Sequence, residues 1–122
     1  MSNSKKTLTF GASENTERYA NMAFHKLTHY GHNVVMIGNK EGVIETVPIQ
    51  KGTPILNDIE TITLYLNPKN QEAYYDYILS LKPKRIIFNP GTENPVLSEK
   101  AKQSNIETIE ACTLVLLSIG QY

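Results

Sequence analysis

Hydrophobic and polar positions divide the chain into two alternating kinds of segment. Short apolar or β-branched runs that stop at Gly, Asn or Pro are typical of strands. Longer segments with apolar residues three and four positions apart are typical of helices. The predicted strands cover residues 7–10, 33–37, 62–66, 85–88 and 106–109. The predicted helices cover residues 19–30, 68–81, 95–105 and 113–119.

This alternation predicts a mainly parallel sheet built from βαβ units with right-handed crossovers. The continuous apolar run Ile86–Phe88 indicates a strand with both faces covered. Residues 40–60 contain Gly42, Pro48, Gly52 and Pro54, so we expect a loop there with one short extended piece around 43–49. The predicted fold is a doubly wound, Rossmann-like, three-layer α/β/α domain with a five-stranded sheet, covering residues 1–122 as one domain.

Composition and charge exclude several classes of protein. The 40% of hydrophobic residues and 20% of charged residues are ordinary for a folded soluble chain. Twelve basic and twelve acidic residues give zero net charge, so no basic field favours nucleic acid. The longest apolar run, Leu114–Leu117, is too short for a membrane span, and the first residues lack the apolar core of a signal peptide. We therefore expect a cytoplasmic protein that binds neither nucleic acid nor membrane.

Polar and small residues concentrate in the connections that leave strands. These connections are Gly11–Glu17, Gly38–Gly42, Asn67–Asn70 and Asn89–Asn94, whereas those that enter strands are minimal. Ligands of open α/β sheets bind where the parallel strands end. The asymmetry therefore predicts a ligand site at this edge, although turns favour the same residue types.

The first connection carries the most chemistry. Gly11, Ala12 and Ser13 are small enough to let the backbone approach a phosphate, Thr16 stands just before the helix, and Arg18 could add a charge-assisted contact. The spacing matches neither G-x-G-x-x-G nor the lysine-bearing P-loop. Glu14 and Glu17 must point outward if an anion binds here. A tight strand-to-helix turn with no ligand is the alternative.

The other connections supply further candidates. Asn39 and Lys40 follow the second strand, where nucleotide-binding sheets contact a ribose. No Asp or Glu ends that strand, and Lys40 suits a phosphorylated ribose better than that of NAD, unless it is simply a solvated turn residue. Four residues of the third and fourth exits complete the candidate set: Asn67, Pro68, Asn89 and Gly91.

The remaining reactive side chains lack suitable partners. His25 and His29 share a helical face opposite the apolar stripe, and no carboxylate supports a zinc site with His32. Cys112 is the one cysteine, which excludes an internal disulfide, and no His or acid at a recognisable spacing would activate it. We assign no catalytic residue and no metal ligand. The tyrosines at positions 74, 75 and 77 spread around one helix and are interpreted as core and its amphipathic edge.

Several of these segments resemble a known family. Phe10–Tyr19 is similar to the strand, Gly-Ala-Ser turn and Arg- or Lys-bearing loop that open the small single-domain CoA-binding proteins, whose fold is similar to the N-terminal domain of the succinyl-CoA synthetase alpha subunit. The likeness extends over residues 7–113. Gly91–Asn94 stands for the family's Gly-x-x-Asn-Glu-like turn, and Ala111–Cys112 for its Arg-Cys pair without the basic residue. The chain departs from the family in two places: only Asn39 remains of the Pro-Val-Asn-Pro-like stretch, and Ile86–Phe88 replaces a strand with tryptophan.

The resemblance implies a binding module for CoA or an acyl-CoA with no catalytic machinery of its own. The 3′-phospho-ADP would lie across the first two exits, and the pantetheine arm would run toward the third and fourth. An oxidoreductase-type domain for NAD(P) or a flavin is one alternative. The missing acid after the second strand argues against NAD, and the lack of tryptophan and of a second domain argues against both. An interaction protein that has lost ligand binding is the other alternative.

The last predicted helix suggests self-association. Leu114–Leu117 is apolar around nearly a full turn, so one sheet face cannot bury all of it. We expect the surplus to pack against a second copy in a two-fold homodimer.

Overall fold

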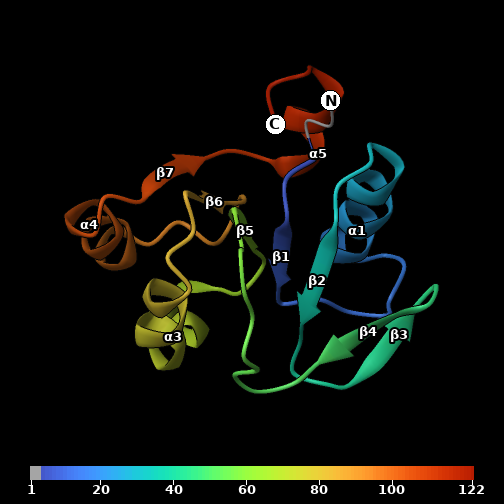
Figure 1. The fold of residues 1–122 in the computed structure, drawn as a ribbon, viewed down its shortest axis with the longest axis horizontal. Coiled ribbons are helices and arrows are strands. Elements are labelled where there is room, and N and C mark those ends of the chain that lie inside the picture. The colour runs from blue at the N-terminus through green and yellow to red at the C-terminus, as the bar shows by residue number, and fades with distance from the viewer. Residues whose placement is uncertain (1–3) are drawn as a thin grey trace.

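The computed structural model describes residues 4–122. The strands are β1 (Thr7–Phe10), β2 (Val34–Ile37), β3 (Gly42–Ile44), β4 (Val47–Gln50), β5 (Thr61–Leu64), β6 (Arg85–Phe88) and β7 (Glu107–Glu110). The helices are α1 (Tyr19–His29), α2 (Pro68–Gln71), the 3₁₀ turn η1 (Glu72–Tyr74), α3 (Tyr75–Ser80), α4 (Pro95–Gln103) and α5 (Thr113–Ser118). Figure 1 shows these elements arranged around the sheet. None of the helices in this part of the chain has the length and hydropathy of a membrane span.

The sheet has seven strands in the order β3-β4-β2-β1-β5-β6-β7, and every neighbouring pair is parallel except β3 with β4. The α/β class and the mainly parallel sheet are as predicted, but the count of five strands is wrong. The five predicted strands correspond to β1, β2, β5, β6 and β7. The other two are the β3–β4 hairpin, which adds to the edge of the sheet beside β2.

The hairpin forms in a segment whose Gly and Pro content predicted a loop. Ile44 pairs with Val47, so the turn has two residues, and Glu45 adopts φ 56° in it. Ile44 and Ile49 bury their side chains against the core, and β4 continues the parallel ladder of β2. Burial of these β-branched residues outweighs the poor strand propensity of Pro48, which stays exposed.

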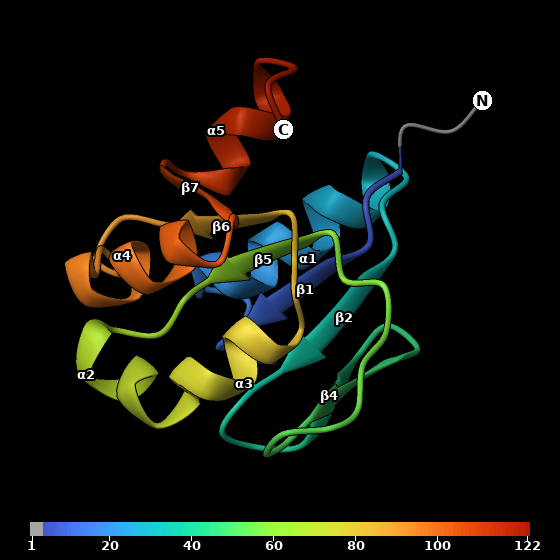
Figure 2. The ribbon, with the colours of Figure 1, turned by 60° about the vertical axis from the view of Figure 1, so that its left-hand side comes forward.

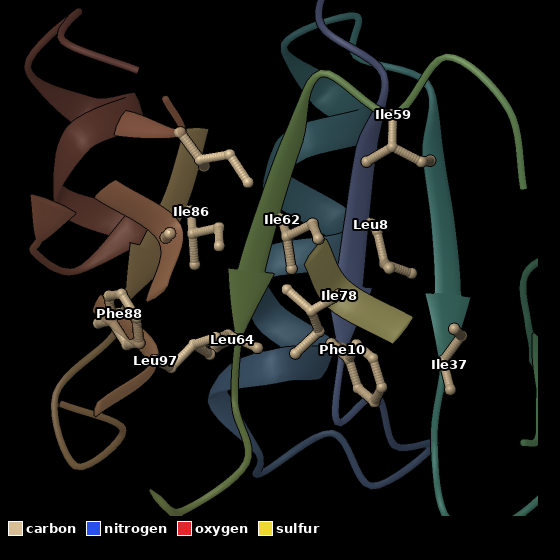
Figure 3. Packing of buried hydrophobic residues seen from close by; sticks show 12 residues of the cluster. Leu8, Phe10, Ile37, Ile59, Ile62, Leu64, Ile78, Ile86, Phe88 and Leu97 are labelled. Atoms are coloured by element: carbon tan, nitrogen blue, oxygen red, sulfur yellow. The ribbon is translucent and has the colours of Figure 1, made fainter. Parts of the chain in front are cut away.

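Helices cover both faces of the sheet. Residues of α1 and Leu117 of α5 pack with Val34 and Met36 on one face. Ile78 of α3 and Leu97 of α4 pack with Leu8, Phe10 and other strand residues on the opposite face. Figure 2 shows α1 and α3 on opposite sides of the strands, and Figure 3 shows Ile78 directed toward the strand side chains Ile62, Leu64 and Phe10. Packing in the two core clusters positions the helices against the strands.

The last residue lies against the start of β1. The Tyr122 hydroxyl is hydrogen-bonded to Thr7 at 2.6 Å, and the guanidinium of Arg85 stacks over the Tyr122 ring at 4.5 Å from its centroid. The ring of His32 lies 4.9 Å from that of Tyr122, and its Nδ1 accepts a 2.9 Å hydrogen bond from the amide of Lys5. Burial, followed by the positive charges of Lys5 and Arg85, lowers the pKa of His32 from 6.5. His32 therefore folds as the neutral imidazole with its proton on Nε2.

This contact predicts a pH-dependent stability. Because the pKa of His32 is lowered in the folded state, the unfolded chain takes up a proton first. Stability that is fully present above about pH 6.5 is therefore lost progressively as the pH falls below that value through the lower pKa of the folded state. Thermal unfolding at pH 7.5 and pH 5.5 should show a smaller pH dependence for His32→Asn, which keeps an acceptor that does not titrate. His29→Asn, at an exposed position, is the control. An unchanged pH dependence in His32→Asn would contradict the role of the imidazole.

The predicted dimer depends on how much of α5 is covered. Leu116 and Leu117 are buried, whereas Val115 and Ile119 are 53% and 59% exposed. Self-association through α5 stays a prediction. Sedimentation at tens of micromolar should give a dimer, and a monomer at that concentration would contradict it.

Candidate functional site

Four parallel strands end at one edge of the sheet. Gly11 follows β1, Asn39 comes two residues after β2, Asn67 three residues after β5, and Asn89 directly after β6. Because β2, β1, β5 and β6 are neighbours and run in the same direction, their exits lie together. The expectation that these four residues share one edge is confirmed.

A cleft of about 840 Å³ opens at this edge. Its volume is within the range of small-molecule sites. Its walls come from the exits of all four strands, from the first residues of α1 and from one face of the α2–η1 run. The lining includes Gly11, Ala12, Ser13, Arg18, Tyr19, Gly38, Asn39, Tyr65, Leu66, Asn67, Lys69, Asn70, Ala73, Tyr74, Pro90, Gly91 and Thr92. Two cationic side chains and no carboxylate lie in it.

The floor of the cleft requires glycine at two positions. Gly11 adopts φ +101°, and a Cβ there would lie 2.9 Å from the carbonyl carbon of Tyr65. A Cβ on Gly38 would lie 2.4 Å from the carbonyl oxygen of Ala12. The exits of β1, β2 and β5 therefore pack backbone against backbone, which no larger residue permits.

The first exit is held by its own hydrogen bonds. The amides of Gly11 and Ala12 both donate to the carbonyl of Ile37, at 2.8 and 2.9 Å. The Ser13 hydroxyl accepts from the amide of Asn15, and the Ser13 carbonyl accepts from the side-chain amide of Asn21. Two amides that the sequence suggested for a phosphate are thus already engaged within the fold. An anion in this cleft must be bound mainly by side chains and by the other amides.

Glu14 points away from the cleft. Its carboxylate accepts a 2.8 Å hydrogen bond from the amide of Val43, and Gly42 leaves the space in which the carboxylate lies. The outward orientation that an anion site requires of this residue is therefore present. The same contact ties the first exit to the β3–β4 hairpin.

Buried amides fix the far wall. The Gln71 side chain donates to the carbonyls of Leu66 and Thr92 at 2.9 and 2.8 Å, and it accepts from Asn94 at 2.9 Å. Asn94 also caps α4 by accepting from the amide of Leu97. Gln71 thus joins the exits of β5 and β6, and the opposite face of the same helical run, with Asn70, Ala73 and Tyr74, faces the cleft.

Asn89, a predicted ligand contact, is buried and serves the fold. Its side-chain NH₂ donates to the Thr63 hydroxyl and the Leu64 carbonyl at 2.7 and 2.9 Å. Its side-chain oxygen accepts from the amide of Thr113 at 2.8 Å. These contacts use the side chain to join β5, β6 and the start of α5, and Asn89 does not line the cleft.

Tyr65 places a buried hydroxyl beside this network. Burial raises the pKa of Tyr65 to about 12, although the nearby hydroxyls of Thr63 and Thr113 act in the opposite direction. The hydroxyl makes no well-formed hydrogen bond within residues 4–122. Tyr65 is therefore a neutral residue at physiological pH, and its hydroxyl is shielded from solvent beneath the cleft-lining part of the residue.

Comparison with known proteins places the chain in a family. The sequence model of the CoA binding domain matches residues 5–118. The chain belongs to the CoA binding domain family. The comparison with curated proteins finds no match.

Solved structures share the fold of this CoA binding domain. One, described as an uncharacterized protein, is 46% identical with a TM-score of 0.96, covering 99% of this chain and 100% of its own. A hypothetical protein from Pyrococcus horikoshii OT3 is 24% identical with a TM-score of 0.83, covering 93% of this chain and 81% of its own. A PH1109 protein redesigned for binding is 22% identical with a TM-score of 0.84, covering 98% of this chain and 87% of its own. The last two show a common fold only.

The structure brings together most, but not all, of the residues that the sequence singled out in this domain. Seven line the cleft: Gly11, Ala12, Ser13, Arg18, Asn39, Asn67 and Gly91. Four lie outside its lining: Thr16, Lys40, Pro68 and Asn89. Lys40 is exposed, and a contact with ligand through its long side chain stays a prediction.

Sequence reasoning missed the wall formed by α2 and η1. Lys69, Asn70 and Tyr74 line the cleft, and Tyr74 also packs edge-on against Phe10 with ring centroids 4.9 Å apart. The signal was the position of Asn67, whose side chain caps α2 by accepting from the amide of Asn70. A helix that begins at a strand exit turns its first residues toward that exit, so Lys69 could have been proposed from the cap.

The close approach of backbones gives a test of the cleft floor. Gly38→Ala should lower the free energy of unfolding by about 1–3 kcal/mol, because the Cβ meets the backbone carbonyl of Ala12, which cannot move aside. Gly42→Ala, where the Cβ meets only the flexible Glu14 carboxylate, should cost less than about 1 kcal/mol. Urea unfolding of both variants measures the difference. Equal losses would show that the Gly38 contact is not a constraint.

Proposed function

We propose that this protein binds CoA or an acyl-CoA in the cleft and acts as a binding module without catalytic machinery of its own. The observation that carries the proposal is the chemistry of the lining in a member of the CoA binding domain family: two cations, three asparagines and no carboxylate at the ends of parallel strands. Such a cleft favours an anionic ligand with several hydrogen-bonding groups.

The cleft also has the extent that an elongated nucleotide needs. Arg18 and Asn39 lie toward β2, where the adenosine part of the ligand would bind. Leu66, Pro90 and Gly91 lie toward β6, where they offer an apolar path for the pantetheine arm. Tyr19 is 67% exposed at the rim and could cover the base.

The groups that would do chemistry are held elsewhere. Cys112 is half-buried at the start of α5 and does not line the cleft. His25 and His29 are exposed along α1, and within residues 4–122 no three His, Cys, Asp or Glu side chains come close enough to hold a metal. Binding without turnover is the function that we propose on this basis.

Ligand-dependent stability tests the proposal. Thermal unfolding should be measured with CoA, acetyl-CoA, NAD, NADP, FMN and ATP. A ligand present at 100 times its dissociation constant adds about 2.7 kcal/mol, which for a chain of this size raises Tm by roughly 5–15 °C. CoA or acetyl-CoA should give the largest shift, and Arg18→Ala should reduce it.

The other ligands decide between the alternatives. A larger shift with NAD, NADP or FMN would favour the oxidoreductase-type domain. No shift with any ligand up to millimolar concentration would contradict the proposal and favour an interaction protein.

A further inference from the structure

We infer that Lys69 and Arg18 form a clamp that holds the diphosphate of the ligand from opposite walls of the cleft. The inference rests on the proposed function, and it assigns a specificity-determining role to Lys69. The class of ligand that follows is one with two adjacent phosphate groups, which a single phosphate would not replace.

Both cations lack partners within the protein. Arg18 and Lys69 line the same cleft, and within residues 4–122 neither makes an ion pair or a side-chain hydrogen bond. Two carboxylates of the loops around the cleft are engaged: Glu14 accepts from the amide of Val43, and Glu93 accepts from the amide of Gly91 at 2.9 Å. Glu17 and Glu41 do not line the cleft. The positive charge in the cleft is therefore not neutralised by the protein.

The two cations come from helices on opposite faces of the sheet. Arg18 is the N-cap of α1, which packs in the core cluster with Met36. Lys69 belongs to α2, and the helical run that it begins packs through Tyr74 and Ile78 on the other face. β1 leads to β2 on one side and β5 leads to β6 on the other, so right-handed crossovers place the helices that follow them on opposite faces. The cleft lies between the first turns of these helices.

The backbone is held by hydrogen bonds at or beside Arg18 and Lys69, while both side chains are free. The carbonyl of Arg18 accepts from the amides of Asn21 and Met22, at 3.1 and 3.2 Å. Lys69 lies between Pro68 and the capped Asn70, and Gln71 anchors the turn through its buried side chain. The two charges are therefore presented from backbone positions held by hydrogen bonds, which lowers the ordering cost of binding an anion between them.

The exit of β1 has few free backbone donors for a phosphate. The amides of Gly11 and Ala12 are both bonded to the carbonyl of Ile37, so they cannot supply the usual backbone cradle for a phosphate. Two cations on separate walls then match two adjacent phosphates, one for each side chain. A lone phosphate would reach one wall and leave the other cation unpaired.

Isothermal titration with CoA, dephospho-CoA, inorganic pyrophosphate and inorganic phosphate tests the clamp. Lys69→Ala should weaken CoA and dephospho-CoA by the same factor, roughly tenfold or more. Lys69→Arg should restore most of the affinity. Lys102→Ala, which removes an equally exposed charge from α4, should change it less than twofold. Pyrophosphate should bind more tightly than phosphate, and Lys69→Ala should remove that difference.

The outcomes separate the clamp from the proposed function. Unchanged CoA affinity in Lys69→Ala would overturn the clamp and leave CoA binding intact. Loss of affinity for CoA but not for dephospho-CoA would place Lys69 at the 3′-phosphate, the contact that the sequence suggested for Lys40, and would also overturn it. Pyrophosphate binding that depends on Lys69, with no CoA binding, would support the clamp and contradict the proposed function. Binding of none of the four would overturn both.

Discussion

The carbonyl oxygen of Ile37 accepts hydrogen bonds from two successive amides, those of Gly11 and Ala12, and the cleft depends on this contact. It draws the exit of β1 against the exit of β2 so closely that the Ala12 carbonyl leaves no room for a Cβ on Gly38. It also turns the chain at Gly11 into a conformation with φ +101° and sends residues 12–18 away from the sheet toward α1. Two backbone donors are used in doing so, so the recognition of anions that we propose falls to the charged side chains.

Polar groups are divided by burial between two tasks. The amide side chains of Gln71, Asn89 and Asn94 are at most 4% exposed, and they join loops that would otherwise move independently. Arg18 and Lys69 are exposed at the positions that this framework holds. A buried amide with all its hydrogen bonds made is costly to displace, whereas an exposed cation has little to lose in exchanging water for phosphate. The buried amides therefore hold the loops around the cleft in place, while the charged groups of Arg18 and Lys69 remain free to contact a ligand.

Periodicity was enough to predict β1, β2, β5, β6 and β7. β1, β5 and β6 are short β-branched or apolar runs with most side chains buried, whereas β7 at the edge of the sheet is only partly buried. Periodicity failed for the β3–β4 hairpin, since Gly42 and Pro48 weigh against a strand locally, whereas pairing with β2 and burial of Ile44 and Ile49 stabilise it. The same distinction between local sequence pattern and tertiary contact applies to the site. Gly11, Ser13 and Arg18 were visible because they lie in one strand-to-helix turn. Lys69 follows the Asn67 cap and could have been proposed from it, whereas the position of Tyr74 depends on how Gln71 anchors the helical run. Asn89 has the composition of a ligand contact but is buried by α5, which no local pattern reveals.

Zero net charge is compatible with the anion binding that we propose for the cleft, because the cleft lining contains two cations and no carboxylate. Glu14 lies outside the cleft and accepts from the amide of Val43, so its charge is partly neutralised by the dipole that it contacts. The cations inside have no such partner. The attraction that these two cations exert on an anion decays within about one Debye length, roughly 8 Å at physiological salt. A long polyanion would gain little electrostatic attraction, because most of its charges lie beyond this distance. A small ligand that places its phosphates between the two walls would have all its phosphates within it.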